Sequence, residues 1–289
     1  DSSLFSAVSG NQSCFVGDIR NVRDLEFAIA DSDIVIHAAA ALPLAPKKDI
    51  FETNVLGTRN VLEVSRKMNV KKVVYVSSTA VYGVPDHHPL VESDQMKGVG
   101  SYGESKVLAE LECMKARKEG MIIPVVRPKT FIGPERLGVF EILFDWVYSG
   151  TKIPVIGDGK NKYQLLDVAD LVSAIELLIN SDDESCNGCF NVGASDFSSV
   201  GDDLGELFKF SKKGSRIFPT NAAFAKSALA ILEFLNLSPL YKWVYGTADQ
   251  DSWVDTSKLQ KLGWSPSYSN SDTLIRTYKW YLENRNSFS

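Results

Sequence analysis

Residues 34–40 have the sequence Ile34-Val35-Ile36-His37-Ala38-Ala39-Ala40, an almost unbroken apolar run. A run of this kind is typical of a parallel strand that is covered on both faces. Two further buried strands are predicted at 73–76 and 122–128, and amphipathic helices at 49–68 and 101–119 separate the three. Alternation of strands and helices with right-handed crossovers gives a doubly wound parallel sheet. The sequence therefore predicts an α/β, Rossmann-like fold.

Elements on both sides of this core extend the pattern. Residues 11–16 resemble a short strand that ends at Gly17-Asp18, and residues 22–30 have the apolar spacing of a helix. Beyond residue 134 the strand–helix alternation loosens. Helices are predicted there at 139–147, 170–180, 198–210, 222–235 and 273–284. We therefore expect one region at 1–134 and a smaller α/β region at 135–289 that partly returns to the core.

Composition and charge exclude several classes of protein. The net charge of −5 and the absence of a basic stripe argue against a nucleic-acid partner. No apolar run approaches the roughly 20 residues of a membrane span. Cys186 and Cys189 have the spacing of a zinc knuckle but no second ligand pair, so we expect a surface turn and no metal. Reduced cysteines and a cytoplasmic enzyme fit this pattern best.

Polar or small residues follow each of the four predicted strands. They are Gly17-Asp18, Ala38-Ala39, Ser77-Ser78 and Arg127-Pro128. In doubly wound sheets the ligand binds beyond the carboxyl ends of the strands. The sequence therefore predicts that these four strand ends converge on one binding crevice.

The helix at 101–119 carries the residues with the clearest chemistry. Tyr102 and Lys106 are four positions apart, which places them on one helix face. A phenol titrates near pH ~10, and a nearby ammonium favours the phenolate, so we expect Lys106 to lower the pKa of Tyr102. Such a phenol can take a proton from an alcohol. Tyr148 and Lys152 share the spacing, but a predicted turn lies between them.

These motifs, in this order, resemble the extended short-chain dehydrogenase/reductases, also called the NAD-dependent epimerase/dehydratase family. The similarity covers nearly the whole chain, and the 54–60 segment is similar to the family's Asn-Val-x-Gly-Thr helix motif. The resemblance implies that residues 1–134 form the nucleotide-binding region and residues 135–289 mainly the substrate-binding region. It further implies a catalytic set of Ser78, Tyr102 and Lys106. It also implies that NAD or NADP is bound by Asp18, Ile19, Ala38, Ala39, Ala40, Asn54, Ser77, Tyr102, Lys106, Arg127 and Pro128. The substrate would be bound by Ser78, Thr79, Thr130 and Tyr163.

The chain departs from the family pattern at three places. No Gly-x-x-Gly-x-x-Gly turn precedes the first predicted strand, so we expect that roughly 30–40 residues are missing from the start of the sequence. The choice between NAD and NADP is then open. Tyr163 stands where sugar-nucleotide enzymes commonly have an arginine, and Lys129 stands where a glycine commonly follows Arg-Pro. Both favour an apolar or sterol-like alcohol over a nucleotide sugar.

Several alternatives remain open at this point. Hydride transfer at a secondary alcohol or ketone could end as a dehydrogenase, an epimerase or a dehydratase reaction. The apolar 222–240 stretch is either core packing or a wall of the substrate pocket. A non-catalytic, nucleotide-sensing or partner-binding member of the fold is the alternative of a different class. The resemblance also implies a possible homodimer through the helices at 49–68 and 101–119.

Overall fold

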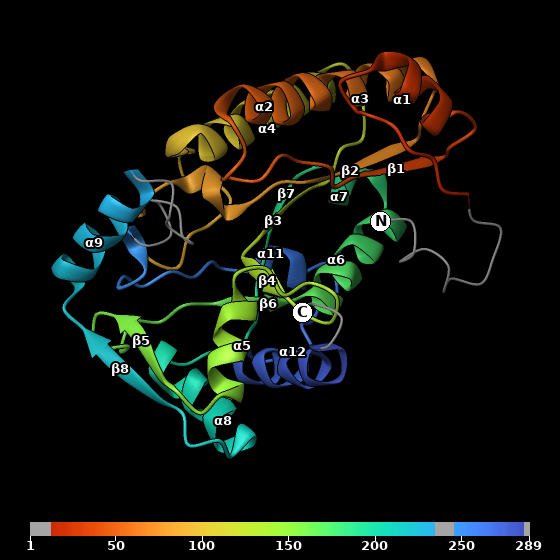
Figure 1. The fold of residues 1–289 in the computed structure, drawn as a ribbon. Helices are drawn as coiled ribbons and strands as arrows, with labels where there is room; N and C mark the ends of the chain where they lie inside the picture. The colour runs from red at the N-terminus through yellow and green to blue at the C-terminus, as the bar shows by residue number, and fades with distance from the viewer. Residues whose placement is uncertain (1–12, 235–245, 286–289) are drawn as a thin grey trace.

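The computed structural model describes residues 13–234 and 246–285 of the chain (Figure 1). Its strands are β1 (Ile34–His37), β2 (Lys72–Val76), β3 (Val125–Pro128), β4 (Thr130–Ile132), β5 (Lys152–Ile156), β6 (Leu165–Asp167), β7 (Cys189–Val192) and β8 (Arg216–Thr220). The main sheet is parallel, in the order β1-β2-β3-β7, and two parallel pairs, β4-β6 and β5-β8, lie outside it.

The helical segments of the described residues flank these strands. They are α1 (Val22–Ile29), α2 (Lys47–Phe51), the π-helical η2 (Glu52–Gly57), α3 (Thr58–Lys67), the 3-10 helix η3 (Thr79–Tyr82), α4 (Gly100–Lys118), α5 (Phe140–Tyr148), α6 (Val168–Asn180), α7 (Asp183–Cys186), α8 (Val200–Ser211), α9 (Ala222–Phe234), α11 (Ser257–Gln260) and α12 (Asn270–Asn284).

Helices cover both faces of the main sheet, because strand side chains alternate in direction. On β2, Val73 and Tyr75 pack in one cluster with Leu62 of α3 and Ala109 of α4. Val76 packs on the opposite face, in the cluster that contains residues of α6 and α11. The predicted doubly wound parallel sheet is thus confirmed.

The second region is built around an aromatic cluster. Phe144 of α5 lies with its ring centroid 5.7 Å from Tyr278 and 5.8 Å from Tyr281, both on α12. The helices α5, α8 and α12 and the strand pairs lie below the main sheet in Figure 1. β7 comes from this part of the chain yet pairs with β3. The proposed boundary at residue 134 stays a prediction.

The predicted strand at 11–16 is wrong for the residues that the structure describes, since 13–18 have no strand. Phe15 is 45% exposed and Val16 is 89% exposed. A strand needs a hydrogen-bonded neighbour, and among the described residues no strand lies beside this segment. β1 is consequently the edge of the described sheet, and Ile36 is half exposed there.

Three further predictions can be compared with the structure. The helix expected at 49–68 contains a π-helical turn, η2, in its middle. Cys186 is fully buried at the end of α7, so a surface turn is wrong for this side chain. The apolar 222–240 stretch forms α9 as far as Phe234, and the rest of it lies outside the described residues. In the described part of the chain, no helix has the length and apolarity needed to span a membrane.

Candidate active site

Ser78 and Tyr102 meet at the carboxyl end of β2. Ser78 caps η3 by accepting a hydrogen bond from the Ala80 backbone nitrogen at 3.2 Å. Tyr102 lies in the first turn of α4, and its hydroxyl shares a hydrogen bond with the Ser78 side chain. A Cβ atom at Gly103 would stand 3.0 Å from the carbonyl oxygen of Ala80. Glycine therefore allows the first turn of α4 to approach η3, which brings the two hydroxyls together.

Lys106 lies one turn further along α4. Its Nζ donates to the Val76 carbonyl at 3.0 Å and to the Tyr75 hydroxyl at 3.3 Å, and the side chain is 2% exposed. Burial lowers the pKa of Lys106 to about 8, and the charge of Glu110 acts in the opposite direction. An ammonium has three N–H donors. Within the described residues two of them have acceptors, so one is available to a ligand in the crevice.

The pKa of Tyr102 differs from the expectation. Burial raises it above the ordinary value, while the hydrogen bond with Ser78 and the charge of Arg136 act to lower it. Lys106 is not among the groups that shift this pKa, and its ammonium donates instead to Val76 and Tyr75. The prediction that Lys106 lowers this pKa is therefore wrong for this geometry. Ser78 and Arg136 take that role.

Arg136 is a residue that sequence reasoning missed. It follows the Gly133-Pro134 segment, and its guanidinium stacks over the Phe131 ring at 5.1 Å from the centroid. No carboxylate lies within 4 Å of it among the described residues, and its charge reaches Tyr102. The signal in the sequence was a cation nine residues after Arg127-Pro128 begins, the strand end that is predicted to face the crevice. The structure adds a positive charge to the catalytic end of the site.

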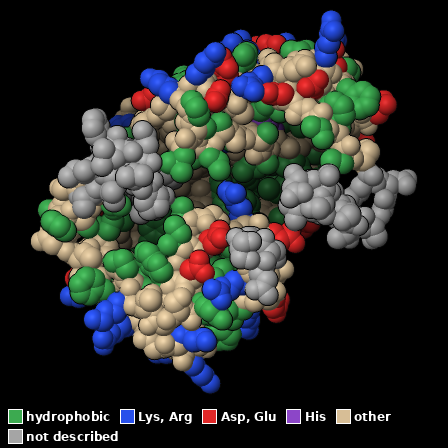
Figure 2. Space-filling view, in the orientation of Figure 1, with side chains coloured by type: hydrophobic (Ala, Val, Ile, Leu, Met, Phe, Trp, Pro, Cys, Tyr) green, Lys and Arg blue, Asp and Glu red, His purple; other side chains and the backbone are tan. Residues whose placement is uncertain are grey.

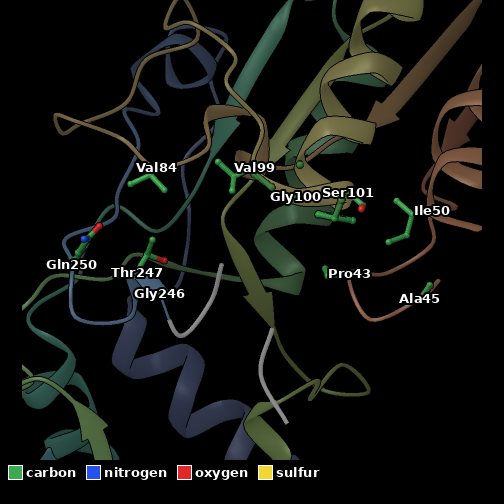
Figure 3. Close-up of a pocket in the computed structure, with 13 residues that line it drawn as sticks. Pro43, Ala45, Ile50, Val84, Val99, Gly100, Ser101, Gly246, Thr247 and Gln250 are labelled. Carbon is green, nitrogen blue, oxygen red and sulfur yellow. The ribbon is translucent and has the colours of Figure 1, made fainter. Parts of the chain in front are cut away.

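A cleft of about 610 Å³ opens beside Tyr102. Pro43, Ala45 and Ile50 line one side of it, and Thr247 and Gln250 lie on the opposite side (Figure 3). Figure 2 shows the hollow between the upper and lower parts of the molecule, with apolar side chains within it. The remaining lining residues are Ala80, Val84, Val99, Gly100, Ser101, Tyr102, Gly103 and Gly246. The cleft is largely apolar.

Three of the predicted cofactor residues follow β1. Ala38 and Ala39 are exposed and Ala40 is half-buried. Asn54 of η2 is 1% exposed, and its side-chain amide accepts a hydrogen bond from the Ala41 nitrogen at 2.7 Å and donates to the Ala41 carbonyl at 3.2 Å. Asn54 also donates to the Ser105 hydroxyl at 3.0 Å. The structure gives Asn54 the role of fixing the loop after β1 to α4, one residue from Lys106.

Asp18 and Ile19 lie at the predicted adenine end. Arg20 donates to the Asp18 carboxylate at 2.6 Å, and this hydrogen bond holds the pKa of Asp18 below its usual value. Ile19 packs against Gly57, where a Cβ atom would stand 2.5 Å from the Ile19 side chain. The glycine of the Asn-Val-x-Gly-Thr motif is thus needed because the 17–19 loop crosses η2 closely.

Ser77 and Arg127 have their side chains in the core. The Ser77 hydroxyl donates to Glu110 at 2.5 Å, and Arg127 donates to the same carboxylate at 2.6 Å. Arg127 also donates to the Tyr82 hydroxyl at 2.9 Å. Glu110 is charged, yet it is 1% exposed and belongs to the core rather than to the solvated face of α4. Any contact of Ser77, Arg127 or the adjacent buried Pro128 with a cofactor would come from the backbone.

The four predicted substrate residues are divided between two places. Ser78 lies beside Tyr102, and Thr79 is buried next to it. Thr130 and Tyr163 share a hydrogen bond of 2.6 Å and line a second cavity. Lys129 stacks on the Tyr163 ring at 4.7 Å from its centroid and donates to the Ser252 hydroxyl at 2.7 Å.

Replacing Lys129 with methionine is expected to stabilise the folded chain by about 1–3 kcal/mol at pH 6. Burial lowers the pKa of Lys129 to about 7, below the ordinary value of 10.5, and the side chain is 4% exposed. Below pH 7 both states are protonated and the folded state carries the full cost of the buried charge. Between pH 7 and 10.5 the unfolded state binds more protons, so the wild type gains stability as the pH rises.

Urea unfolding at pH 6 and pH 10 checks this prediction. The excess of the variant's unfolding free energy over that of the wild type should be smaller at pH 10 than at pH 6. Lys152→Met, at an exposed position on β5, serves as the control and should leave both values within about 0.5 kcal/mol of wild type. A gain in stability that is absent at pH 6, or equal at both pH values, would contradict the assignment of a buried ammonium that has no carboxylate partner among the described residues.

The sequence matches the model of one protein family and resembles several proteins of known sequence. The model of the NAD dependent epimerase/dehydratase family matches residues 5–193. The uncharacterized protein y4nG of Sinorhizobium fredii is 37% identical over 275 residues, which are 93% of this chain and 68% of that protein. A putative UDP-glucose 4-epimerase of Methanocaldococcus jannaschii is 28% identical over 92% of this chain and 83% of its own length.

Solved structures resemble the whole described architecture. An epimerase from Methanothermobacter thermautotrophicus superposes with a TM-score of 0.78 and covers 97% of this chain and 81% of its own. Its sequence is 23% identical to this chain, so this likeness shows the fold alone.

Proposed function

Because the chain belongs to the NAD-dependent epimerase/dehydratase family, we propose that Tyr102, Ser78 and Lys106 catalyse hydride transfer at a secondary alcohol or ketone. The chain is an enzyme of the extended short-chain dehydrogenase type. The observation that carries the residue assignment is the hydrogen bond between the Tyr102 and Ser78 hydroxyls, with the buried ammonium of Lys106 one turn below them on α4.

Tyr102 handles the proton in this proposal. Its hydroxyl gives a proton to a carbonyl oxygen, or takes one from an alcohol, at the mouth of the cleft. Ser78 donates a second hydrogen bond to the same oxygen and fixes its distance from Tyr102. Arg136 adds a positive charge that favours the phenolate. A bound nicotinamide supplies or accepts the hydride.

The described residues fit the nicotinamide half of such a cofactor. Lys106 has one N–H that no described residue accepts, and its Nζ bonds the carbonyl of Val76, the last residue of β2. In the loop after β1, Ala38 and Ala39 are exposed and Ala40 is half-buried. We propose that Lys106 holds the nicotinamide ribose and that the loop after β1 supports the adjoining phosphate. The 289 residues contain no Gly-x-x-Gly-x-x-Gly turn.

Turnover with NAD and NADP, each supplied separately, tests the proposal. The absorbance of the reduced nicotinamide is followed with a panel of secondary alcohols and ketones. Binding is measured in parallel by thermal shift, where a cofactor at a hundred times its Kd should stabilise the fold by about 2.7 kcal/mol. Binding of neither cofactor would instead support the non-catalytic member of the fold.

A homodimer through α4 is the proposed assembly. Leu108, Leu111 and Met114 are 41%, 46% and 38% exposed along this helix. Apolar side chains at this spacing make a helix face that a second copy could cover. A sedimentation profile that stays monomeric at high protein concentration would contradict the dimer.

A further inference from the structure

One face of α4 meets the carboxyl end of β2 through three side chains. The helix lies above the main sheet in Figure 1. Tyr102, Lys106 and Glu110 are four positions apart, so they lie on one helix face, one turn after another. Tyr102 bonds the Ser78 side chain, Lys106 bonds the Val76 carbonyl, and Glu110 bonds the residue between these two. Three turns of α4 therefore contact three successive residues of the chain.

The Glu110 carboxylate is buried and held from two strands. It accepts from the Ser77 hydroxyl at 2.5 Å and from the Arg127 guanidinium at 2.6 Å. Arg127 in turn donates to the Tyr82 hydroxyl of η3 at 2.9 Å. These contacts fix a negative charge relative to β2, β3 and η3, one helical turn from Lys106.

The charge state of Lys106 decides what this side chain can offer a ligand. As an ammonium it has three N–H groups, and Val76 and Tyr75 accept two of them. As a neutral amine it has two N–H groups, which the same acceptors use, and only a lone pair remains. The ammonium therefore offers a ligand hydroxyl a charge-assisted N–H donor, and such hydrogen bonds are stronger than those between neutral groups.

Two effects act on this charge in opposite directions. Burial lowers the pKa of Lys106 to about 8, and the charge of Glu110 acts to raise it. Other titratable groups from β1, β2 and α4 lie near the ammonium, and burial keeps them uncharged around neutral pH. It lowers the pKa of the histidine to about 3 and raises the pKa of the phenols and the thiol; they are His37, Tyr75, Tyr102 and Cys113. Glu110 is thus the carboxylate that favours the ammonium.

We propose that Glu110 is a positioning residue of the active site, which keeps Lys106 in the ammonium form that binds the nicotinamide ribose. The ribose half of this inference rests on the proposed function, and the ammonium half does not. Glu110 does not line the cleft, so it acts through Lys106. Removing its charge would also leave the positive charge of Arg127 without a partner at this place, which further disfavours the ammonium.

Nuclear magnetic resonance of the lysine side chains tests the ammonium half in the protein without cofactor. Lys106→Arg assigns the Lys106 resonance, and Lys129→Met assigns the lysine whose pKa is about 7. The Lys106 midpoint should lie at about 8 in the wild type. In Glu110→Gln it should lie lower by about one pH unit or more, the effect of losing a neighbouring opposite charge. An unchanged midpoint would overturn the proposal.

Two further variants separate the charge of Glu110 from its packing. Glu110→Asp keeps the carboxylate but is one methylene shorter, so it should lose stability and still keep the Lys106 midpoint within about half a pH unit of wild type. Glu112→Gln removes a more exposed carboxylate of the same helix and should leave the midpoint unchanged. Equal falls of the midpoint in Glu110→Asp and Glu110→Gln would show that packing alone acts on Lys106.

A double variant repeats the test in a protein that has no unpaired buried guanidinium. Glu110→Leu combined with Arg127→Met removes both charges of the pair, and its fold is checked by circular dichroism. Its Lys106 midpoint should also lie below the wild-type value, because the carboxylate is gone. A midpoint at or above that value would overturn the proposal, even if Glu110→Gln does not fold.

Cofactor binding tests the ribose half and separates this inference from the proposed function. The Kd of NAD, measured by calorimetry at pH 7.5, should be about tenfold higher in Glu110→Gln than in wild type, the loss expected for one charge-assisted hydrogen bond. The two values should converge as the pH falls, and a ratio that is equal at every pH would overturn the ribose assignment.

The two measurements can also disagree, and each disagreement has one meaning. A lowered Lys106 midpoint in Glu110→Gln, with no NAD binding by the wild type, would leave the ammonium role of Glu110 assigned and refute hydride transfer. Turnover of a ketone by the wild type, with an unchanged Lys106 midpoint in Glu110→Gln, would support hydride transfer and refute the role of Glu110.

Discussion

Replacing Tyr102 with phenylalanine is expected to lower kcat by roughly 10²–10⁴-fold, the range that a positioned acid or base contributes. The change removes one hydroxyl, the group that shares a hydrogen bond with Ser78 and lies at the cleft. Loss of that hydrogen bond should cost about 1 kcal/mol of stability, so the fold is retained. Steady-state turnover with the alcohol or ketone identified in the panel gives kcat, and circular dichroism confirms the fold.

The chain contains its own control for this experiment. Tyr148 and Lys152 have the same spacing as Tyr102 and Lys106, but Tyr148 ends α5 and Lys152 begins β5. Tyr148→Phe should therefore leave kcat within about twofold of wild type. Near-normal turnover by Tyr102→Phe on a proven substrate would remove Tyr102 from the catalytic set, and an equal loss in both variants would indicate a general effect of the substitution.

Replacing Glu110 with glutamine is expected to destabilise the folded chain by about 3–5 kcal/mol, because it leaves the buried guanidinium of Arg127 without a counter-charge. The two side chains are 1% and 2% exposed, and their closest nitrogen–oxygen distance is 2.6 Å. Glu110 also accepts from Ser77, so the same change leaves a buried hydroxyl without its strongest acceptor. Thermal unfolding should show a Tm lower by roughly 6–15 °C.

Glu112→Gln is the matched control on the same helix. Glu112 pairs with Arg59 at 2.6 Å, but the two side chains are 19% and 47% exposed. Solvent screens such a pair, and its loss should cost no more than about 1 kcal/mol. The double variant Glu110→Leu, Arg127→Met should recover part of the stability lost in Glu110→Gln. Equal losses of stability in Glu110→Gln and Glu112→Gln would show that the buried ion pair stabilises the fold no more than the exposed one.

The alternation of elements could be predicted from the sequence because each signal is local. The apolar runs at 34–40 and 122–128 contain β1 and β3, the run at 73–76 covers all of β2 but Lys72, and the spaced apolar residues after Tyr102 lie in α4. The strand expected at 11–16 failed because a strand requires a neighbour to pair with. The sequence of a segment alone does not supply one.

The π-helical turn at η2 is a second example. Helical periodicity extends through 49–68, and nothing in that pattern marks the point where the hydrogen bonding changes. The turn places Asn54 against the loop after β1 and against Ser105. Contacts of this kind join residues far apart in the chain, so they depend on the packed sheet.

The amino-acid sequence by itself determined the α/β class, the order of the main strands along the chain and the spacing of Ser78, Tyr102 and Lys106. These follow from short-range periodicity and from covalent order. Only the tertiary structure decided that Glu110 is a buried partner of Arg127 and not a solvated residue. It also decided that Ser78 and Arg136, rather than Lys106, act on the pKa of Tyr102. Burial and charge at a site are set by side chains from distant segments, and folding alone brings them into contact.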